Sequence, residues 1–257
     1  MPLSGKKALI TGARRNIGRG IALALAAAGC VVGIHDIERD EEAEETLFLL
    51  KQMGADAEFF AADLRDSKQI AELFNAFATR FGGVDILVNN AYWAAHKPFL
   101  EIEEANWDQA MDVCLKSYFL CAQQAAKRMV ARGQGGSIVG IASIHGQRVW
   151  PTDTCYGVAK AGVIRLGQSM AVDLAAYGIR SNCILPGYMD TEHAFGTAAP
   201  ALGSAPGHTH GHIPTQRYGT PEDIGRAVVF LCGEGAAQIT GVALPVDGGF
   251  LTTGFPG

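Results

Sequence analysis

Short apolar runs alternate along the chain with segments of helical pattern, and this alternation constrains the fold more than any other feature. The runs lie at residues 8–10, 31–34, 86–88, 137–141, 181–185 and 242–246, and the first four are separated by stretches long enough for crossover helices. Strands joined by crossover helices pair in parallel and carry helices on both faces. The sequence therefore predicts an α/β fold in three layers, with a doubly wound parallel sheet between two layers of helices.

Helical periodicity and turn residues place the expected helices. An alanine-rich helix over 21–28 should end at Gly29, and the acidic run 38–45 should open the next helix; further helices are expected over 67–81, 107–131 and 156–177. No Pro/Ser-rich linker divides the 257 residues, so we expect one domain, 1–257. The irregular segment 192–218, rich in Gly, Pro, Ala and His, is typical of a lid or a disordered loop, and we expect a substrate lid.

Charge and cysteine content argue against several classes of protein. The net charge is −5 without a basic block, which disfavours partners such as nucleic acid or an anionic membrane. No window approaches the roughly 20 apolar residues of a membrane span, so we expect a cytoplasmic protein that acts on a small molecule. The six cysteines contain no C-x-x-C pair and are expected to be reduced.

A glycine-rich turn lies between the first apolar run and the first expected helix. The segment Thr11-Gly12-Ala13-Arg14-Arg15-Asn16-Ile17-Gly18 would aim free backbone amides and a positive helix end at a pyrophosphate. An ordinary tight turn is the alternative. Asp36 follows the second run, eighteen residues beyond Gly18, where a carboxylate can hold the ribose hydroxyls of a dinucleotide.

Tyr156 and Lys160 are four residues apart in an expected helix, and Ser143 lies upstream of them. Side chains at this spacing share a helix face, so an ammonium group can stand beside a phenol. Lowering a tyrosine pKa from about 10 to about 7 requires roughly 4 kcal/mol, which a charge at about 4–5 Å can supply. The spacing predicts a proton-transfer pair in which Lys160 acidifies Tyr156; the alternative is a surface pair without chemistry.

In this order the motifs resemble those of the short-chain dehydrogenases/reductases, in their single-domain branch with a Rossmann-type fold. The resemblance covers nearly the whole chain. The glycine turn is similar to T-G-x-x-x-G-x-G, Asn89-Asn90-Ala91 to N-N-A-G, and Ser143, Tyr156 and Lys160 to the catalytic Ser and Y-x-x-x-K. The segments Pro186-Gly187 with Thr191 and Asp247-Gly248-Gly249 resemble P-G-x-x-x-T and the terminal D-G-G.

The resemblance implies a catalytic set, Ser143, Tyr156 and Lys160, and a nicotinamide dinucleotide as cofactor. Asp63 and Leu64 would line the adenine site, Asn90 the ribose region, and Met189 with Thr191 the carboxamide. The acid at 36 favours NAD over NADP, whereas Arg15 stands where NADP-dependent members carry a base. The implied cofactor-binding residues are Gly12, Arg15, Asn16, Ile17, Gly18, Asp36, Ile37, Asp63, Leu64, Asn90, Tyr156, Lys160, Gly187, Met189 and Thr191.

Three residues depart from the family pattern. Asn16 replaces the middle glycine of the turn, and asparagine tolerates the left-handed backbone better than other non-glycine residues. Tyr92 replaces the glycine of N-N-A-G and is expected to shape the nicotinamide pocket. Cys114 replaces the asparagine that anchors a water to the lysine, which predicts a slower or rerouted proton relay.

Substrate hints come from the segment before the catalytic tyrosine. Ser143-Ile144-His145 followed by Trp150-Pro151 resembles glucose dehydrogenases of this family, so His145 and Trp150, with Ser143 and Tyr156, would contact an aldose or polyol. A packed loop without substrate contact is the alternative. His208, His210 and His212 alternate within the lid, but without accompanying carboxylates or cysteines we expect a solvated or substrate-contacting loop and no metal.

The resemblance thus implies an NAD-dependent oxidoreductase that interconverts a secondary alcohol and a carbonyl, with Tyr156 as general acid/base. Two alternatives stay open: a lyase, isomerase or dehalogenase on the same fold without net redox change, and an NAD-binding regulator with vestigial activity. The family pattern also implies a homodimer or homotetramer, packed through helices such as 107–131 and 156–177.

Overall fold

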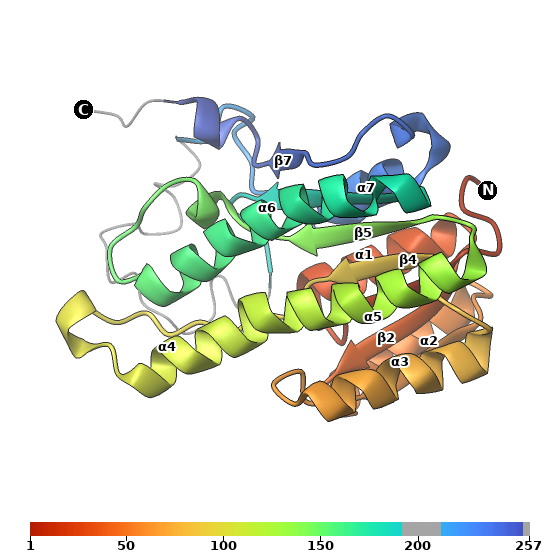
Figure 1. Ribbon diagram of the computed structural model, residues 1–257. Helices are drawn as coiled ribbons and strands as arrows, with labels where there is room; N and C mark the ends of the chain where they lie inside the picture. Colours follow the sequence, from red (N-terminus) through yellow and green to blue (C-terminus); the bar gives the residue numbers. More distant parts are fainter. Residues whose placement is uncertain (192–211, 254–257) are drawn as a thin grey trace.

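Seven parallel strands form one sheet in the computed structural model, which describes residues 1–191 and 212–253 (Figure 1). The strand order is β3-β2-β1-β4-β5-β6-β7, so the direction of winding reverses between β1 and β4. This is the predicted doubly wound sheet. The strands are β1 (Lys7–Thr11), β2 (Val31–Asp36), β3 (Ala57–Ala61), β4 (Ile86–Asn89), β5 (Gly136–Ile141), β6 (Ile179–Pro186) and β7 (Ala243–Val246).

Helices cover both faces of the sheet and complete the three layers. One face carries α1 (Asn16–Ala27), α2 (Glu41–Gln52) and α7 (Pro221–Cys232), whose core residues include Ile21, Leu47 and Val228. The other carries α3 (Ser67–Phe81), α4 (Glu104–Met111), α5 (Ser117–Arg132) and α6 (Thr154–Leu174). Figure 1 shows α5 and α6 lying side by side along this second face.

Helix boundaries follow from capping chemistry in the sequence. The acidic run opens α2, with the Asp40 side chain accepting a hydrogen bond from the Ala43 backbone N–H. Asp66 caps α3 in the same way. Gly29 follows α1 with φ +95°, the left-handed conformation expected of a residue that ends a helix.

Two predictions of secondary structure need correction. The edge strand β3 was absent from the expected runs, because its sequence Ala-Glu-Phe-Phe-Ala contains only two buried side chains and a charge. The expected helix 107–131 begins earlier and is interrupted by a π-helical turn, Asp112–Lys116, between α4 and α5. Such turns are frequent at functional sites. Within the described residues, no helix is long and apolar enough to span a membrane.

Candidate active site

The glycine turn after β1 is built so that backbone atoms pack without room for side chains. Gly12 has φ +63°, and a Cβ added there would lie 2.6 Å from Ala91 Cα; one added at Gly18 would lie 2.1 Å from the Gly12 carbonyl oxygen. The Asn90 amide donates to the Thr11 and Gly12 carbonyl oxygens at 3.1 and 2.7 Å. The turn is therefore fixed at the sheet's winding reversal, where dinucleotides bind in folds of this type.

Asn16 occupies the left-handed region in this turn, with φ +49°. This confirms the prediction that asparagine can replace the middle glycine. Ile17 and Gly18 lie in the first turn of α1, the end of the helix that carries the positive partial charge. The binding of a pyrophosphate at this turn stays a prediction.

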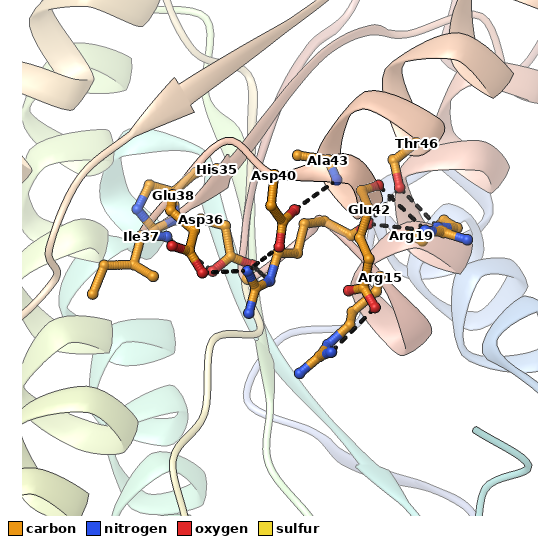
Figure 2. Close-up of polar contacts among 12 residues, drawn as sticks. Arg15, Arg19, His35, Asp36, Ile37, Glu38, Asp40, Glu42, Ala43 and Thr46 are labelled. Atoms are coloured by element: carbon orange, nitrogen blue, oxygen red, sulfur yellow. Dashed lines mark hydrogen bonds and ion pairs between the residues drawn. The ribbon is translucent and has the colours of Figure 1, made fainter. Parts of the chain in front are cut away.

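Asp36 ends β2 beside the turn and belongs to an acidic cluster (Figure 2). Arg14 lies between its carboxylates: its guanidinium is 3.7 Å from Asp36 Oδ2 and 2.9 Å from Glu38 Oε1, and it also pairs closely with Asp40. Desolvation opposes the charge of Arg14, but the surrounding carboxylates raise its pKa overall. Arg14 was not predicted from the sequence, where Arg15 was the only base expected near the ribose.

Arg15 turns toward α2 and pairs with Glu42 at 3.2 Å, as Figure 2 shows. Two guanidinium groups, Arg14 and Arg15, therefore face four carboxylates at this corner. This corner therefore carries a local excess of negative charge. Ile37 follows Asp36 with its side chain 53% exposed, which leaves an apolar surface beside the same corner.

The remaining predicted cofactor residues lie at the carboxyl ends of neighbouring strands. Asp63 and Leu64 follow β3; the Asp63 carboxylate is held by Arg65, whose hydrogen bond lowers the pKa of Asp63. Gly187 follows β6 where a Cβ would lie 2.7 Å from Asp247 Cα, so the D-G-G segment packs against this strand end. Met189 is buried and bridges to Gly219, which positions the start of the segment that contains Thr191.

Ser143, Tyr156 and Lys160 converge at the end of β5. Ser143 is buried at the start of a short 3₁₀ turn, Ile144–Gly146, which packs on α6, and Tyr156 and Lys160 lie in the first turns of α6. A hydrogen bond joins Ser143 to Tyr156. The Lys160 Nζ lies 5.5 Å from the centre of the Tyr156 ring. The structure thus brings together the three residues that the sequence grouped.

The predicted acidification of Tyr156 is not found among the protein groups. Burial raises the pKa of Tyr156, although the hydrogen bond with Ser143 acts in the opposite direction. Burial likewise lowers the pKa of Lys160. Spacing along a helix could not reveal this, because the cost of placing either charge in the protein interior depends on tertiary packing.

Lys160 is 1% exposed and donates two hydrogen bonds that the sequence did not predict. Its Nζ donates to the Ile141 carbonyl oxygen at 2.7 Å and to the Tyr118 hydroxyl at 3.2 Å. Tyr118 in turn donates to Ile141 O at 3.1 Å, and burial raises its pKa well above the usual value, so it stays a neutral phenol. These bonds hold the ammonium behind the Tyr156 ring.

Cys114 lies at the centre of the π-helical turn and is fully buried. Its Sγ donates to the Trp93 carbonyl oxygen and accepts from the Trp93 backbone N–H, both at 3.2 Å. These two hydrogen bonds therefore connect the loop after β4 to the π-helical turn. The effect of this replacement on proton relay stays a prediction.

His145 and Trp150 both lie in the segment between β5 and α6. Their rings stack with centroids 4.1 Å apart and an interplanar angle of 8°, and the His145 ring meets the Tyr156 ring edge-on at 5.7 Å. Tyr92 follows β4 and is 63% exposed, and its ring centroid lies 6.4 Å from that of Tyr156. This is the position expected of a residue that shapes the pocket. Phe250 and Tyr188, which the sequence analysis missed, extend this aromatic wall.

The predicted lid lies mostly outside the described residues, as do His208 and His210. His212 is described and exposed. At the described end of the segment, the Thr215 backbone N–H donates to the Gly248 carbonyl oxygen at 3.2 Å, which joins it to the D-G-G segment. In residues 1–191 and 212–253, no group of three His, Cys, Asp or Glu side chains is arranged to hold a metal ion.

Comparison with known proteins agrees with this geometry. A family model described as Enoyl-(Acyl carrier protein) reductase matches residues 12–251, from the glycine turn to beyond the D-G-G segment. The chain belongs to the short-chain dehydrogenase/reductase family. The resemblance and the fold are thereby confirmed.

Individual relatives cover almost the whole chain. The 2-dehydro-3-deoxy-D-gluconate 5-dehydrogenase of Escherichia coli K12 is 36% identical over 250 residues, which span 97% of this chain and 96% of that protein. A short-chain type dehydrogenase/reductase from Mycobacterium marinum superimposes with a TM-score of 0.88 at 31% identity, covering 98% and 97% of the two chains. A proposed 2-deoxy-D-gluconate 3-dehydrogenase from Agrobacterium tumefaciens with bound NADP gives a TM-score of 0.89 at 36% identity, covering 98% and 99%.

This short-chain dehydrogenase/reductase is therefore an oxidoreductase of the alcohol/carbonyl class that uses a nicotinamide cofactor. The residues fit such a group: the turn has no space for side chains at Gly12 and Gly18, and an acid stands at the end of β2.

Proposed function

We propose that the protein interconverts a secondary alcohol and a carbonyl with NAD, and that its substrate is a sugar, sugar acid or polyol. The observation that carries this proposal is the convergence of Ser143, Tyr156 and Lys160 at the same strand edge as the glycine turn and Asp36. The residues proposed to handle the proton and those proposed to bind the dinucleotide thus lie at one edge of the sheet. Two relatives named for gluconate derivatives support the substrate class.

In the proposed mechanism, Tyr156 takes the proton of the substrate hydroxyl during oxidation and returns it during reduction. A bound nicotinamide supplies the hydride acceptor or donor. Ser143 orients the substrate oxygen and stabilises the charge that develops on it. Lys160, held by Ile141 O and Tyr118, would place a positive charge behind the phenol and would hold the ribose of a bound cofactor.

The first prediction concerns cofactor choice at the acidic corner. Asp36→Asn removes one carboxylate and leaves the charge of Arg14 less neutralised, so the 2′-phosphate of NADP should be repelled less. The preference for NAD over NADP should therefore fall about tenfold or more. The measurement is the ratio of kcat/KM for the two cofactors. Glu44→Gln, which removes an exposed carboxylate of α2 paired with Arg39, is the control and should leave the ratio unchanged. A wild-type preference for NADP would contradict the NAD assignment.

The second prediction concerns pH. Oxidation requires Tyr156 to act as a base, and burial raises its pKa, so the phenolate fraction should still be increasing at alkaline pH. The rate of alcohol oxidation should therefore keep rising up to at least about pH 9, because even a free tyrosine has a pKa of about 10. Single-turnover rates across this range measure it. A plateau already reached at neutral pH would show that the tyrosine is acidified after all.

The substrate class is tested with a panel of aldoses, polyols, hydroxy acids, cyclic alcohols and ketones, followed by absorbance of the reduced cofactor with NAD and NADP in parallel. The proposal expects reduction of NAD with at least one polyhydroxylated substrate. Substrate turnover without net change in reduced nicotinamide would favour the lyase or isomerase alternative. Cofactor binding without turnover of any substrate would favour the regulator.

Assembly into a homodimer or homotetramer is part of the same proposal. Apolar side chains remain exposed on α4, α5 and α6, the helices expected at the interface: Trp107, Phe119, Val130, Val158 and Val172. A second copy would cover part of this surface. The single-domain organisation and cytoplasmic location stay predictions.

A further inference from the structure

A buried carboxylate pairs with the imidazole that stands beside Tyr156. The His145 Nδ1 lies 2.6 Å from Asp153 Oδ2, and the side chains are 23% and 4% exposed. The His145 ring contacts the Tyr156 ring edge-on at 5.7 Å. Asp153 has no role in the mechanism above, so the burial of its charge next to the proton-transfer residue calls for an explanation.

The surroundings of Asp153 show that its partner is the imidazole. Asp153 precedes α6, yet its side chain makes no capping hydrogen bond to that helix. Its other oxygen, Oδ1, is buried without a hydrogen-bond partner among the described residues, and His96 Nδ1 lies 3.9 Å from it. The carboxylate is thus placed for His145 rather than for the helix end.

Neighbouring residues fix the geometry of this pair. Trp150 stacks on the His145 ring at 4.1 Å, which sets the plane of the imidazole. Gly157 leaves space for the carboxylate, because a Cβ there would lie 3.1 Å from Asp153 Oδ2 and 3.2 Å from the His145 carbonyl oxygen. The ring is therefore held on three sides: by the carboxylate, by the indole and by the Tyr156 edge.

The pairing determines which imidazole nitrogen can serve a substrate. A carboxylate only accepts, so Nδ1 carries the proton and donates to Asp153. In the neutral ring, Nε2 then holds a lone pair and accepts a hydrogen bond. No described residue bonds to Nε2 in the structure. A hydroxyl group is the substrate feature that such an acceptor recognises.

We propose that His145, oriented by Asp153, accepts a hydrogen bond from a second substrate hydroxyl near the reacting carbon, because the centres of the His145 and Tyr156 rings lie 5.7 Å apart. This inference rests on the proposed function and narrows its substrate class to vicinal or near-vicinal polyols and their ketones. His145 is the binding residue, and Asp153 is a positioning residue that acts through it. A simple alcohol offers no hydroxyl to Nε2, and sites built around a hydrogen bond reject such analogues strongly.

The substrate arm of the test compares cis-1,2-cyclohexanediol with cyclohexanol. The wild type should prefer the diol by about 100-fold or more in kcat/KM. His145→Phe keeps a flat ring against Trp150 but removes the acceptor, so the preference should fall to within about threefold, with most of the loss on the diol. An unchanged preference in the variant overturns the proposal. A preference for a hydroxy acid that His145→Phe abolishes also overturns it, because it would identify an imidazolium that binds a carboxylate.

The positioning arm has a readout besides turnover. In the ¹⁵N spectrum of the full-length protein, the His145 nitrogens, assigned by their loss in His145→Phe, should show Nδ1 protonated and Nε2 unprotonated. Asp153→Asn, which preserves a good helix-start residue, should populate the other tautomer and reduce the diol preference about tenfold. Asp173→Asn, an exposed acid near the other end of α6, is the matched control. An unchanged tautomer in Asp153→Asn would contradict the assigned role.

The two arms separate this inference from the proposed function. If no alcohol reduces NAD or NADP, the proposed function fails, whatever the tautomer of His145. If alcohols are oxidised but diol and monoalcohol are used equally, the oxidoreductase proposal stands and the recognition of a second hydroxyl is refuted.

Discussion

Tyr156→Phe is expected to lower the rate of alcohol oxidation by at least about 1,000-fold, because it deletes the one hydroxyl that transfers the substrate proton. The ring contacts with Tyr92 and His145 involve the aromatic faces and edges, so the variant should retain the shape of the pocket. Cofactor affinity should stay within about threefold of the wild type. Initial rates and a fluorescence titration with the reduced cofactor measure the two quantities separately.

Tyr177→Phe provides the matched control, since Tyr177 is 54% exposed beyond the far end of α6. This control should behave as the wild type in both measurements. Full turnover in Tyr156→Phe would show that another group handles the proton. If Tyr156→Phe loses both cofactor binding and turnover, the phenol supports the cofactor site instead.

Gly18→Ala should weaken dinucleotide binding by about 100-fold or more, the second large effect. The added Cβ would lie 2.1 Å from the Gly12 carbonyl oxygen and 2.8 Å from Asn90 Nδ2, so the turn and the amide that fixes it must both move. Overpacking of this kind typically costs about 1–3 kcal/mol, and here the displaced atoms belong to the turn proposed to bind the pyrophosphate. Titration with NADH measures the dissociation constant.

Gly235→Ala is the control for this substitution, because its nearest new contact would be the Phe230 ring at an ordinary 3.7 Å. Thermal unfolding without cofactor distinguishes local displacement from general loss of stability. If Gly18→Ala folds and binds the dinucleotide as the wild type does, the turn is not the phosphate site.

The sheet could be predicted because each central strand is an apolar run bounded by turn residues. Strands such as β1 and β4 are buried on both faces and therefore read as continuous Leu, Ile and Val. The edge strand β3 lacks this signal, since only Phe59 and Phe60 face the interior. The π-helical turn was also unpredictable from periodicity, because one extra residue hardly alters the pattern of a long helix.

Some residues of the site could likewise be grouped from the sequence, and others could not. Residues that follow strands could be placed together, because parallel strands all present their carboxyl ends at one edge. Partners that approach from distant segments could not: Tyr118 reaches Lys160 from α5, and Arg14 enters the acidic corner through the fold of the turn. The direction of the Tyr156 pKa shift could likewise not be predicted from the sequence, because it depends on burial created by the whole pocket.

Transfer of deuterium from substrate to cofactor tests the central claim most directly. A secondary alcohol that the panel identifies as a substrate, labelled with deuterium on the carbinol carbon, is incubated with wild-type protein and NAD, and the reduced cofactor is analysed by mass spectrometry. We expect one deuterium in each molecule of NADH, with none formed by Tyr156→Phe over the same time. Conversion of the alcohol while the cofactor gains no deuterium would contradict the proposed hydride transfer.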